Sequence, residues 1–193
     1  MINKKTLIQP EELFKNLPYL ETERLKLRKL TMRDAGDVFE YASVPEVSLY
    51  VSWMPHRTIA DTKSFLKHVL FQYEKGIPAS WGIVLKENNK LIGTGGYLWW
   101  AAEHSKAELG YVVSDKYWNK GYMTEALKKI LQFGFETMNL QRIEARCFVE
   151  NTASERVMKK CGMKLEGILR SSSFVKGAYR DFKLYSILKS ENT

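Results

Sequence analysis

The chain contains few residues of the kinds that hold metals or form cross-links. Only two of its 193 residues are cysteines, Cys147 and Cys161, and neither belongs to a CxxC pair. Such isolated cysteines are typical of reduced, largely buried side chains. The three histidines, His56, His68 and His104, show no ligand spacing. These absences argue against a disulfide framework and against a metal centre.

Long apolar runs are also missing. No stretch approaches the roughly 20 apolar residues that a membrane span needs, and the start, MINKKTLIQPEELFKNL, lacks the continuous apolar segment of a signal peptide. The chain shows no repeats, low-complexity segments or linkers. We therefore expect a cytoplasmic protein that does not enter a membrane. Its length, 45% hydrophobic residues and 27% charged residues are typical of one soluble globular domain.

Positive charge exceeds negative charge by a formal net +8. Three interpretations are compatible with this excess: an ordinary solvated basic surface, proximity to nucleic acid or the ribosome, or a small phosphorylated ligand. The charge alone does not distinguish them.

Periodicity predicts a mixed α/β order of elements. Residues 1–20 are expected to form an N-terminal extension with a short helix after Pro10, and residues 21–190 a single domain. The region 44–57 is expected to be an aromatic-containing loop. Helices are expected at residues 31–43, 58–75, 121–138 and 151–161, and strands at residues 24–30, 107–114 and 141–149, with antiparallel pairs at residues 80–100 around Asn88–Asn89 and 164–188 around Lys176–Gly177.

The stretch SDKYWNKGYMTEALKKI, residues 114–130, joins a predicted strand to a predicted helix through a turn. A helix N-terminus has unpaired N–H groups and partial positive charge, which attract phosphate. Gly121 has no side chain to block a ligand, and Lys120 adds a cation to the turn. An anion site and a merely tight turn with a solvated lysine are equally compatible with this segment taken alone.

Longer segments resemble the GNAT superfamily of acyl-CoA N-acyltransferases, in particular its RimJ/RimL branch. They are LETERLKLRKLTMRDAGDVFEYAS, AELGYVVSDKYWNKGYMTEAL, RIEARCFVENTASERVMKKCGMKLEGILR and GAYRDFKLYSIL. The resemblance implies the GNAT fold, a central, mostly antiparallel, splayed sheet flanked by helices. It also implies acetyl-CoA as cosubstrate, with its pyrophosphate on main-chain N–H groups of Asn119, Lys120, Gly121, Tyr122, Met123 and Thr124. The pantetheine arm would pair with the strand edge at Tyr111, Val112 and Val113.

The turn departs from the family pattern Q/R-x-x-G-x-G/A at two positions. Trp118 stands in place of Gln or Arg, and Met123 in place of Gly or Ala. Because the backbone supplies the hydrogen bonds, both side chains are compatible with the site if they point away from the phosphates.

The resemblance also suggests residues for the chemistry. Glu108 matches a strand position at which several relatives have a general base, although a structural ion pair is an equal alternative. Asn151 matches a residue that contacts the pantetheine arm and is also a good helix N-cap. Ser154 matches a serine proposed to bind the cofactor sulfur, and we take it as the candidate acid. Met158 replaces the tyrosine acid of many relatives, and Ser173 replaces a glutamate of some RimL-like relatives.

The resemblance implies an N-acetyltransferase whose acceptor is the N-terminal α-amine of a protein, with a ribosomal protein expected. Contact with nucleic acid would then arise only through the ribosome, and a homodimer is compatible with the family. No Ser/His/Asp or Cys/His arrangement suggests an acyl-enzyme, so we expect direct transfer in a ternary complex. A small amine, such as a polyamine or an aminoglycoside, and a non-catalytic basic module that binds ribosomes or RNA remain alternatives. The aromatic-rich positions Trp53, Met54, Tyr97, Trp99 and Trp100 are compatible with a groove, a core or a dimer contact.

Overall fold

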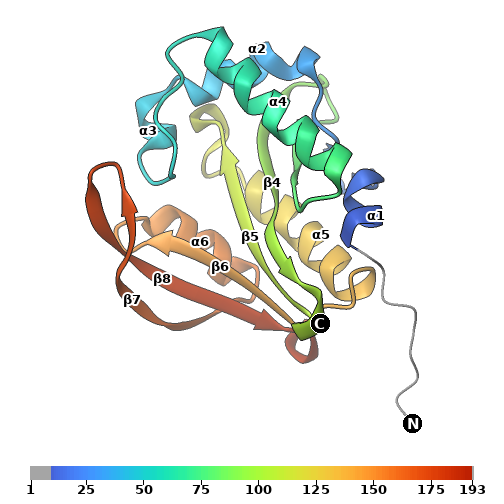
Figure 1. Ribbon diagram of the computed structural model, residues 1–193, viewed down its shortest axis with the longest axis vertical. Coiled ribbons are helices and arrows are strands. Elements are labelled where there is room, and N and C mark those ends of the chain that lie inside the picture. The colour runs from blue at the N-terminus through green and yellow to red at the C-terminus, as the bar shows by residue number, and fades with distance from the viewer. Residues whose placement is uncertain (1–9, 193) are drawn as a thin grey trace.

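An open sheet of eight strands lies at the centre of the protein, seen here in a computed structural model that describes residues 10–192 (Figure 1). The strands are β1 (Leu20–Glu21), β2 (Leu25–Arg28), β3 (Ser80–Leu85), β4 (Leu91–Ala101), β5 (Lys106–Val113), β6 (Arg142–Phe148), β7 (Lys164–Val175) and β8 (Ala178–Leu188). The helices are α1 (Pro10–Lys15), α2 (Ala35–Ala42), α3 (Pro45–Ser48), α4 (Ile59–Lys75), α5 (Tyr122–Glu136) and α6 (Thr152–Lys160), with short 3₁₀ turns η1 (Met32–Asp34), η2 (Ala102–His104), η3 (Asp115–Tyr117) and η4 (Lys189–Glu191).

The sheet has the order β1-β2-β3-β4-β5-β6-β8-β7, and all its neighbouring strands are antiparallel except β5 and β6. The parallel pairing of β5 with β6 ends at Leu109 opposite Ala145. Beyond that pair the two strands diverge, and Figure 1 shows the two halves of the sheet opening like a V. The predicted mixed α/β fold with a mostly antiparallel, splayed sheet is confirmed.

Helices pack on the sheet through their apolar sides. Helices α5 and α6 contact each other and lie behind the strands in Figure 1, whereas α4 contacts α1 and α2. The predicted apolar side of α5 is buried, because Ala126, Leu127, Ile130, Leu131 and Phe135 are at most 2% exposed. Burial of such a stripe is the main source of stability for a helix of this length.

Local sequence signals set several boundaries. Thr31 and Asp34 form the predicted capping box, although the first turn is 3₁₀ rather than α. The two hairpin turns also follow prediction, with positive φ at Asn89 and at Lys176 and Gly177. The region 44–57 differs in part from prediction, because it includes the short helix α3, which starts with a proline at its first position.

The N-terminal segment packs against the rest of the described chain. Phe14 and Leu17 are buried, and the rings of Phe14 and Trp100 pack edge to face. Strand β1 pairs with β2. The division between an extension and a domain at residues 20 and 21 stays a prediction, and residues 1–9 of the predicted extension lie outside the described residues.

The aromatic residues considered for a groove do not form one surface. Tyr97 is buried, and its hydroxyl donates to the carbonyl of Ile130 in α5. Trp100 packs on Phe14, and Trp53 packs on His56. Trp99 instead donates its Nε1 to Glu108, at 2.8 Å. Tyr97 therefore belongs to the core, the half-buried Trp53 and Trp100 pack against it, and Trp99 contributes to the region described next.

Candidate active site

The turn before α5 has the backbone shape that the sequence suggests. Gly121 is the N-cap of α5 and has left-handed dihedral angles, φ 80° and ψ −3°. Asn119 also has a positive φ, 59°, a conformation that asparagine adopts more readily than most residues. Gly121 has no side chain to cap the helix, so the first N–H groups of α5 have no side-chain cap partner at that position. The left-handed φ favours glycine here, and the absence of a side-chain cap leaves the first N–H groups of the helix available to a ligand.

Space is open around this glycine. A Cβ placed on Gly121 would meet a single heavy atom within 4 Å, Nη2 of Arg24 at 3.5 Å. The side chains of Met123 and Trp118, on either side of this glycine, each have contacts elsewhere. Met123 is 5% exposed and packs in the core, and Trp118 donates its Nε1 to the carbonyl of Val113, at 3.0 Å. The side chain of Met123 therefore points inward, away from the proposed phosphate site, as the unusual residue at this position requires.

An arginine distant in sequence holds the turn from its other side. Arg24 donates from Nη1 to the carbonyl of Lys120 at 3.1 Å and from Nε to Glu125 at 2.6 Å, and its guanidinium lies 4.4 Å from the ring centre of Tyr122. Sequence reasoning missed this anchor. The acid in the first turn of α5 is visible in the sequence, but a partner 101 residues away is not.

The Arg24–Glu125 pair also sets the charge at this helix end. A carboxylate in the first turn would repel a phosphate, but Glu125 accepts hydrogen bonds from the backbone and side chain of Arg24 and from Thr22. Burial raises the pKa of Glu125, but these hydrogen bonds outweigh it and lower the pKa below its usual value. The carboxylate is thus occupied by its own partners, and the positive end of the helix dipole remains available.

Strand β5 has a free edge directly before this turn. Gly110, Tyr111, Val112 and Val113 pair with β4 on one side, but none pairs with β6 on the other. Unpaired main-chain groups at a strand edge can bind an extended ligand as an additional strand would. The three residues named from sequence, Tyr111, Val112 and Val113, all lie in this edge, where the carbonyl of Val113 already accepts a hydrogen bond from Trp118.

A pair of hydroxyl groups bridges the gap between β5 and α6. Asn151 caps α6 by accepting a hydrogen bond from the N–H of Ser154, at 3.0 Å, as its N-cap signal predicts. The Tyr111 hydroxyl lies 2.7 Å from Oγ of Ser154 and 3.2 Å from its carbonyl oxygen. Burial raises the pKa of the Tyr111 phenol, so this group stays protonated at neutral pH. Met158, at the position where many relatives have tyrosine, is fully buried.

Glu108 lies in the sheet with its carboxylate fully engaged. Its side chain accepts from Trp99 Nε1 and forms an ion pair with Arg146, whose Nη2 lies 2.6 Å from Oε2. Arg146 Nε also lies 3.1 Å from both carboxylate oxygens. Glu108 is 6% exposed, and both residues of this ion pair lie in strands, Glu108 in β5 and Arg146 in β6. The geometry agrees with the ion-pair alternative for Glu108, and its role as a base stays a prediction.

Within residues 10–192 the structure contains neither a metal-binding cluster nor a membrane-spanning helix. In that range no group of three or more His, Cys, Asp or Glu side chains could hold a metal ion. None of the helices there is both long and apolar enough to cross a membrane.

With this geometry in place, comparisons with known proteins identify the family. The family model described as an acetyltransferase (GNAT) domain matches residues 24–164, which include the turn, the free β5 edge and Ser154. The chain belongs to the GNAT acetyltransferase family. GNAT acetyltransferases use acetyl-CoA, and this protein is accordingly an acetyl-CoA-dependent N-acetyltransferase.

Individual proteins agree with the family assignment. The chain is 36% identical over 174 residues to the uncharacterised N-acetyltransferase YoaA of Bacillus subtilis, covering 89% of this chain and 97% of that protein. The crystal structure of a GNAT acetyltransferase from Bacillus anthracis has a TM-score of 0.81 and 34% identity, covering 90% of this chain and all of that one. The ribosomal-protein-serine acetyltransferase of Escherichia coli is 27% identical over 126 residues, 65% of this chain and 69% of that protein. These similarities agree with a RimJ/RimL-like GNAT protein.

The residues present are compatible with the cosubstrate of this family. An uncapped helix start with an open left-handed glycine suits the pyrophosphate of acetyl-CoA, and the free edge Gly110–Val113 suits its pantetheine arm. Ser154 contacts Tyr111 of this edge from α6, and Asn151 caps the same helix through the N–H of Ser154. The structure thus brings the turn, the free β5 edge and Ser154 together. Glu108 lies instead in the paired part of β5, opposite Glu144, with Arg146 and Trp99 as its partners.

Proposed function

We propose that the protein acetylates the N-terminal α-amine of a protein, with a ribosomal protein as the expected acceptor in the cytoplasm. The proposed acetyl-CoA site rests on one observation. The free edge of β5 is followed along the chain by the open turn at Gly121. The proposal that the acceptor is a protein N-terminus is supported by similarity to the ribosomal-protein-serine acetyltransferase of E. coli.

Within this proposal the main-chain N–H groups of residues 119–124 bind the pyrophosphate. Lys120 is exposed, with its ammonium 5.3 Å from the Tyr117 ring centre, and it adds positive charge beside the turn. The main chain of Tyr111, Val112 and Val113 and the side chain of Asn151 position the pantetheine arm. Binding through backbone groups preserves the strand and needs no particular side chain at Val112 or Val113.

The chemical step is a direct transfer. The neutral amine attacks the thioester carbonyl carbon, the carbon–sulfur bond breaks, the amine nitrogen loses a proton and the departing thiolate gains one. Ser154 is the proposed donor to the thiolate, with its hydroxyl held by Tyr111. A cysteine intermediate is disfavoured, because burial raises the pKa of Cys147 and Cys161 to about 11 and keeps both thiols protonated at neutral pH.

Glu108 remains our proposed acceptor of the amine proton. Its oxygens already accept from Arg146 and Trp99, so we propose that the proton reaches it through water rather than by direct contact. The ion pair with Arg146 would then fix the position of the carboxylate.

An acetylation assay tests the acceptor class. Acetyl-CoA is incubated with peptides that carry free N-termini of ribosomal proteins, with the same peptides N-formylated, and with spermidine and an aminoglycoside, and thiol release is followed. We expect release only with free N-termini. Release with spermidine or the aminoglycoside but with no free peptide would refute the proposed acceptor while leaving the N-acetyltransferase activity intact.

A substitution in the turn tests the cofactor site. Gly121→Glu places a carboxylate where the pyrophosphate is proposed to bind, and we expect it to abolish acetyl-CoA binding measured by calorimetry. Gly162→Glu is the matched control, because Gly162 has nearly the same left-handed φ, 82°, but lies after α6. Both variants carry similar backbone strain, so unchanged acetyl-CoA affinity in Gly121→Glu would remove the assignment of this turn.

A further inference from the structure

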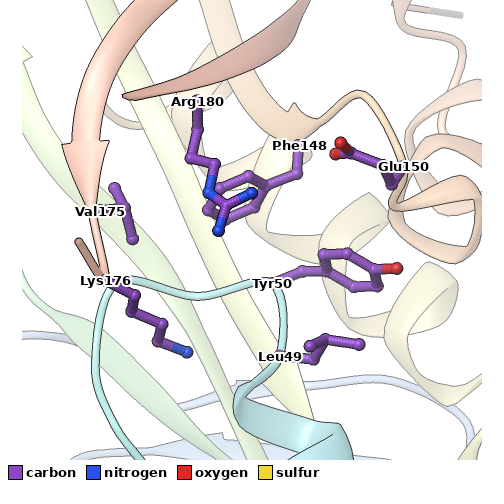
Figure 2. A pocket seen from close by; sticks show the side chains of 7 residues that line it. All are labelled: Leu49, Tyr50, Phe148, Glu150, Val175, Lys176 and Arg180. Carbon is purple, nitrogen blue, oxygen red and sulfur yellow. The ribbon is translucent and has the colours of Figure 1, made fainter. Parts of the chain in front are cut away.

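A pocket of about 190 Å³ lies between the segment after α3 and the tip of the β7–β8 hairpin. Figure 2 shows the side chains that line it: Leu49, Tyr50, Phe148, Glu150, Val175, Lys176 and Arg180. The hairpin is fixed to α3, because Lys176 Nζ donates to the carbonyl of Ser48. Two segments far apart in the sequence thus enclose one space.

This pocket adjoins the proposed reaction site. Phe148 and Arg146 are two residues apart in β6, so their side chains lie on the same face of the sheet, and Arg146 binds Glu108. Glu150 directly precedes Asn151, the cap of the helix that carries Ser154. An acceptor in the pocket would therefore lie on the Glu108 face, at the end of β6 where the sheet is open.

The walls of the pocket differ in charge. Arg180 and Lys176 come from the hairpin, and Glu150 lies across the pocket from Arg180 in Figure 2, with Tyr50 and Phe148 also lining the space. Within residues 10–192 no ion pair is formed by any of these three charged side chains. Most other buried or half-buried charges of the sheet are paired, as the Glu108–Arg146 pair illustrates.

Within residues 10–192, neither Lys176 nor Arg180 forms an ion pair. Partial burial lowers the pKa of Lys176, and the positive charge of the neighbouring Arg180 lowers it further. An anion bound between them would offset both positive charges, and the planar guanidinium of Arg180 suits a carboxylate bound through two hydrogen bonds.

The remaining lining is apolar. The ring centres of Tyr50 and Phe148 are 6.0 Å apart, and Phe148 also packs on Phe182 at 4.6 Å. This apolar lining suits a ligand that has a short aliphatic segment between two charged groups. A polycation such as spermidine would instead bring positive charge to Arg180 and Lys176.

We propose that this pocket selects acceptors that carry an anionic group close to the amine, with the carboxylate of an acidic residue near a protein N-terminus bound by Arg180 and Lys176. Glu150 lies opposite, where it attracts the incoming ammonium group. This inference rests on the proposed function, and it narrows the acceptor class to acidic N-termini.

Matched peptides test the inference. Hexapeptides that differ only at the second residue, Asp, Asn or Lys, are compared by kcat/KM for thiol release. Because hydrogen bonds to charged groups contribute roughly 1.5–3 kcal/mol, we expect the Asp peptide to exceed the Asn peptide by about 10-fold or more, and the Lys peptide to be poorest. Arg180→Glu should reverse the order of the Asp and Lys peptides. Arg33→Glu, in an exposed arginine outside the pocket, should leave it unchanged.

Each outcome is decisive. Equal kcat/KM for the Asp and Asn peptides, or an Arg180→Glu enzyme that binds acetyl-CoA normally but keeps the original order, would overturn the inference. If no peptide of any charge releases thiol, the proposed protein acceptor fails. The pocket is then tested with free glutamate against glutamine, where a preference for glutamate supports the anionic pocket and its absence overturns it.

Discussion

At the scale of single residues, the hydroxyl pair of Ser154 and Tyr111 bears most directly on catalysis. Met158 cannot supply a proton and is fully buried, so a tyrosine acid at that position is not available. Tyr111 reaches Ser154 from a different element, β5, with 2.7 Å between the two oxygens. A fixed serine hydroxyl that faces the departing sulfur would stabilise the thiolate more than a rotating one.

Removal of either hydroxyl should therefore slow the chemical step. We expect Ser154→Ala to lower kcat by about 10²-fold, at the lower end of general-acid effects, with little change in KM for acetyl-CoA. Tyr111→Phe should lower kcat less, because Ser154 remains. The measurement is steady-state thiol release at saturating acceptor.

Two comparisons make this result specific. Thr152→Ala removes an exposed hydroxyl from the same helical turn and should keep wild-type kcat. If the two hydroxyls act as a unit, the double variant should be little slower than Ser154→Ala alone. A Ser154→Ala enzyme with wild-type kcat would reduce the serine to a structural residue.

Single residues differ in how far the sequence alone reveals them. Gly121 and Asn151 were predictable, because a left-handed glycine before a helix and an N-cap are local features. Arg24, Arg146 and the hydroxyl of Tyr111 were not, because each acts through a partner brought near by the fold. Glu108 was found, but its ion pair with Arg146 depends on the register of β5 against β6.

At the scale of elements, one carboxylate joins α6 to β8. Glu155 accepts from Lys183 at 2.6 Å, from the Tyr185 hydroxyl at 2.7 Å and from Lys159 at 2.7 Å. Met158 is the one buried residue of α6, so this helix has little apolar contact of its own. Glu155 therefore helps to hold the helix that carries Ser154.

The pH dependence of stability should report this link. Hydrogen bonds from Lys159, Lys183 and Tyr185 lower the pKa of Glu155 from 4.5 to about 2. A lowered folded-state pKa means that the stabilisation is complete above pH 4.5 and is lost as the pH falls toward 2. Glu155→Gln should have a lower urea midpoint than wild type at pH 6, and the difference should shrink as the pH approaches 2.

The control for this prediction is a carboxylate without such partners. Glu87→Gln lies in the turn between β3 and β4 and should match wild type at every pH. A difference between Glu155→Gln and wild type that stays constant from pH 6 to pH 2 would show that Glu155 acts through packing rather than charge.

Most elements were predictable from the periodicity of the sequence, but α3 was too short to be found in this way. Four residues in a turn-rich segment produce no helical period, so the short helix after Val44 escapes a pattern search. The predicted hairpins at Asn89 and at Lys176–Gly177 were correct, because the residues that tolerate positive φ fix the turns. The pocket between α3 and the second hairpin could not be predicted, since it depends on how these two elements meet.

At the scale of the whole molecule, the splayed sheet divides the described chain into two halves that are joined by a short stretch of pairing between β5 and β6. Lys106–Leu109 pair with Arg142–Ala145, and the strands then separate. Acetyl-CoA bound along the free β5 edge and at the start of α5 would fill this gap and contact both halves. Ligand that binds only the folded state stabilises it, by about 2.7 kcal/mol at a concentration of 100 Kd.

Hydrogen exchange followed by mass spectrometry should show where that stabilisation acts. On addition of acetyl-CoA, we expect amide exchange to slow together in residues 119–124 and at those residues of Gly110–Val113 whose N–H groups point away from β4, because these groups become ligand-bonded. The tip of the β7–β8 hairpin, where Lys176 and Gly177 form the turn, should change little until an acceptor is added. Protection at the hairpin with acetyl-CoA alone, and none at the β5 edge, would mean that the cofactor binds on the Phe148 side of the sheet. The roles proposed here for the two sites would then be exchanged.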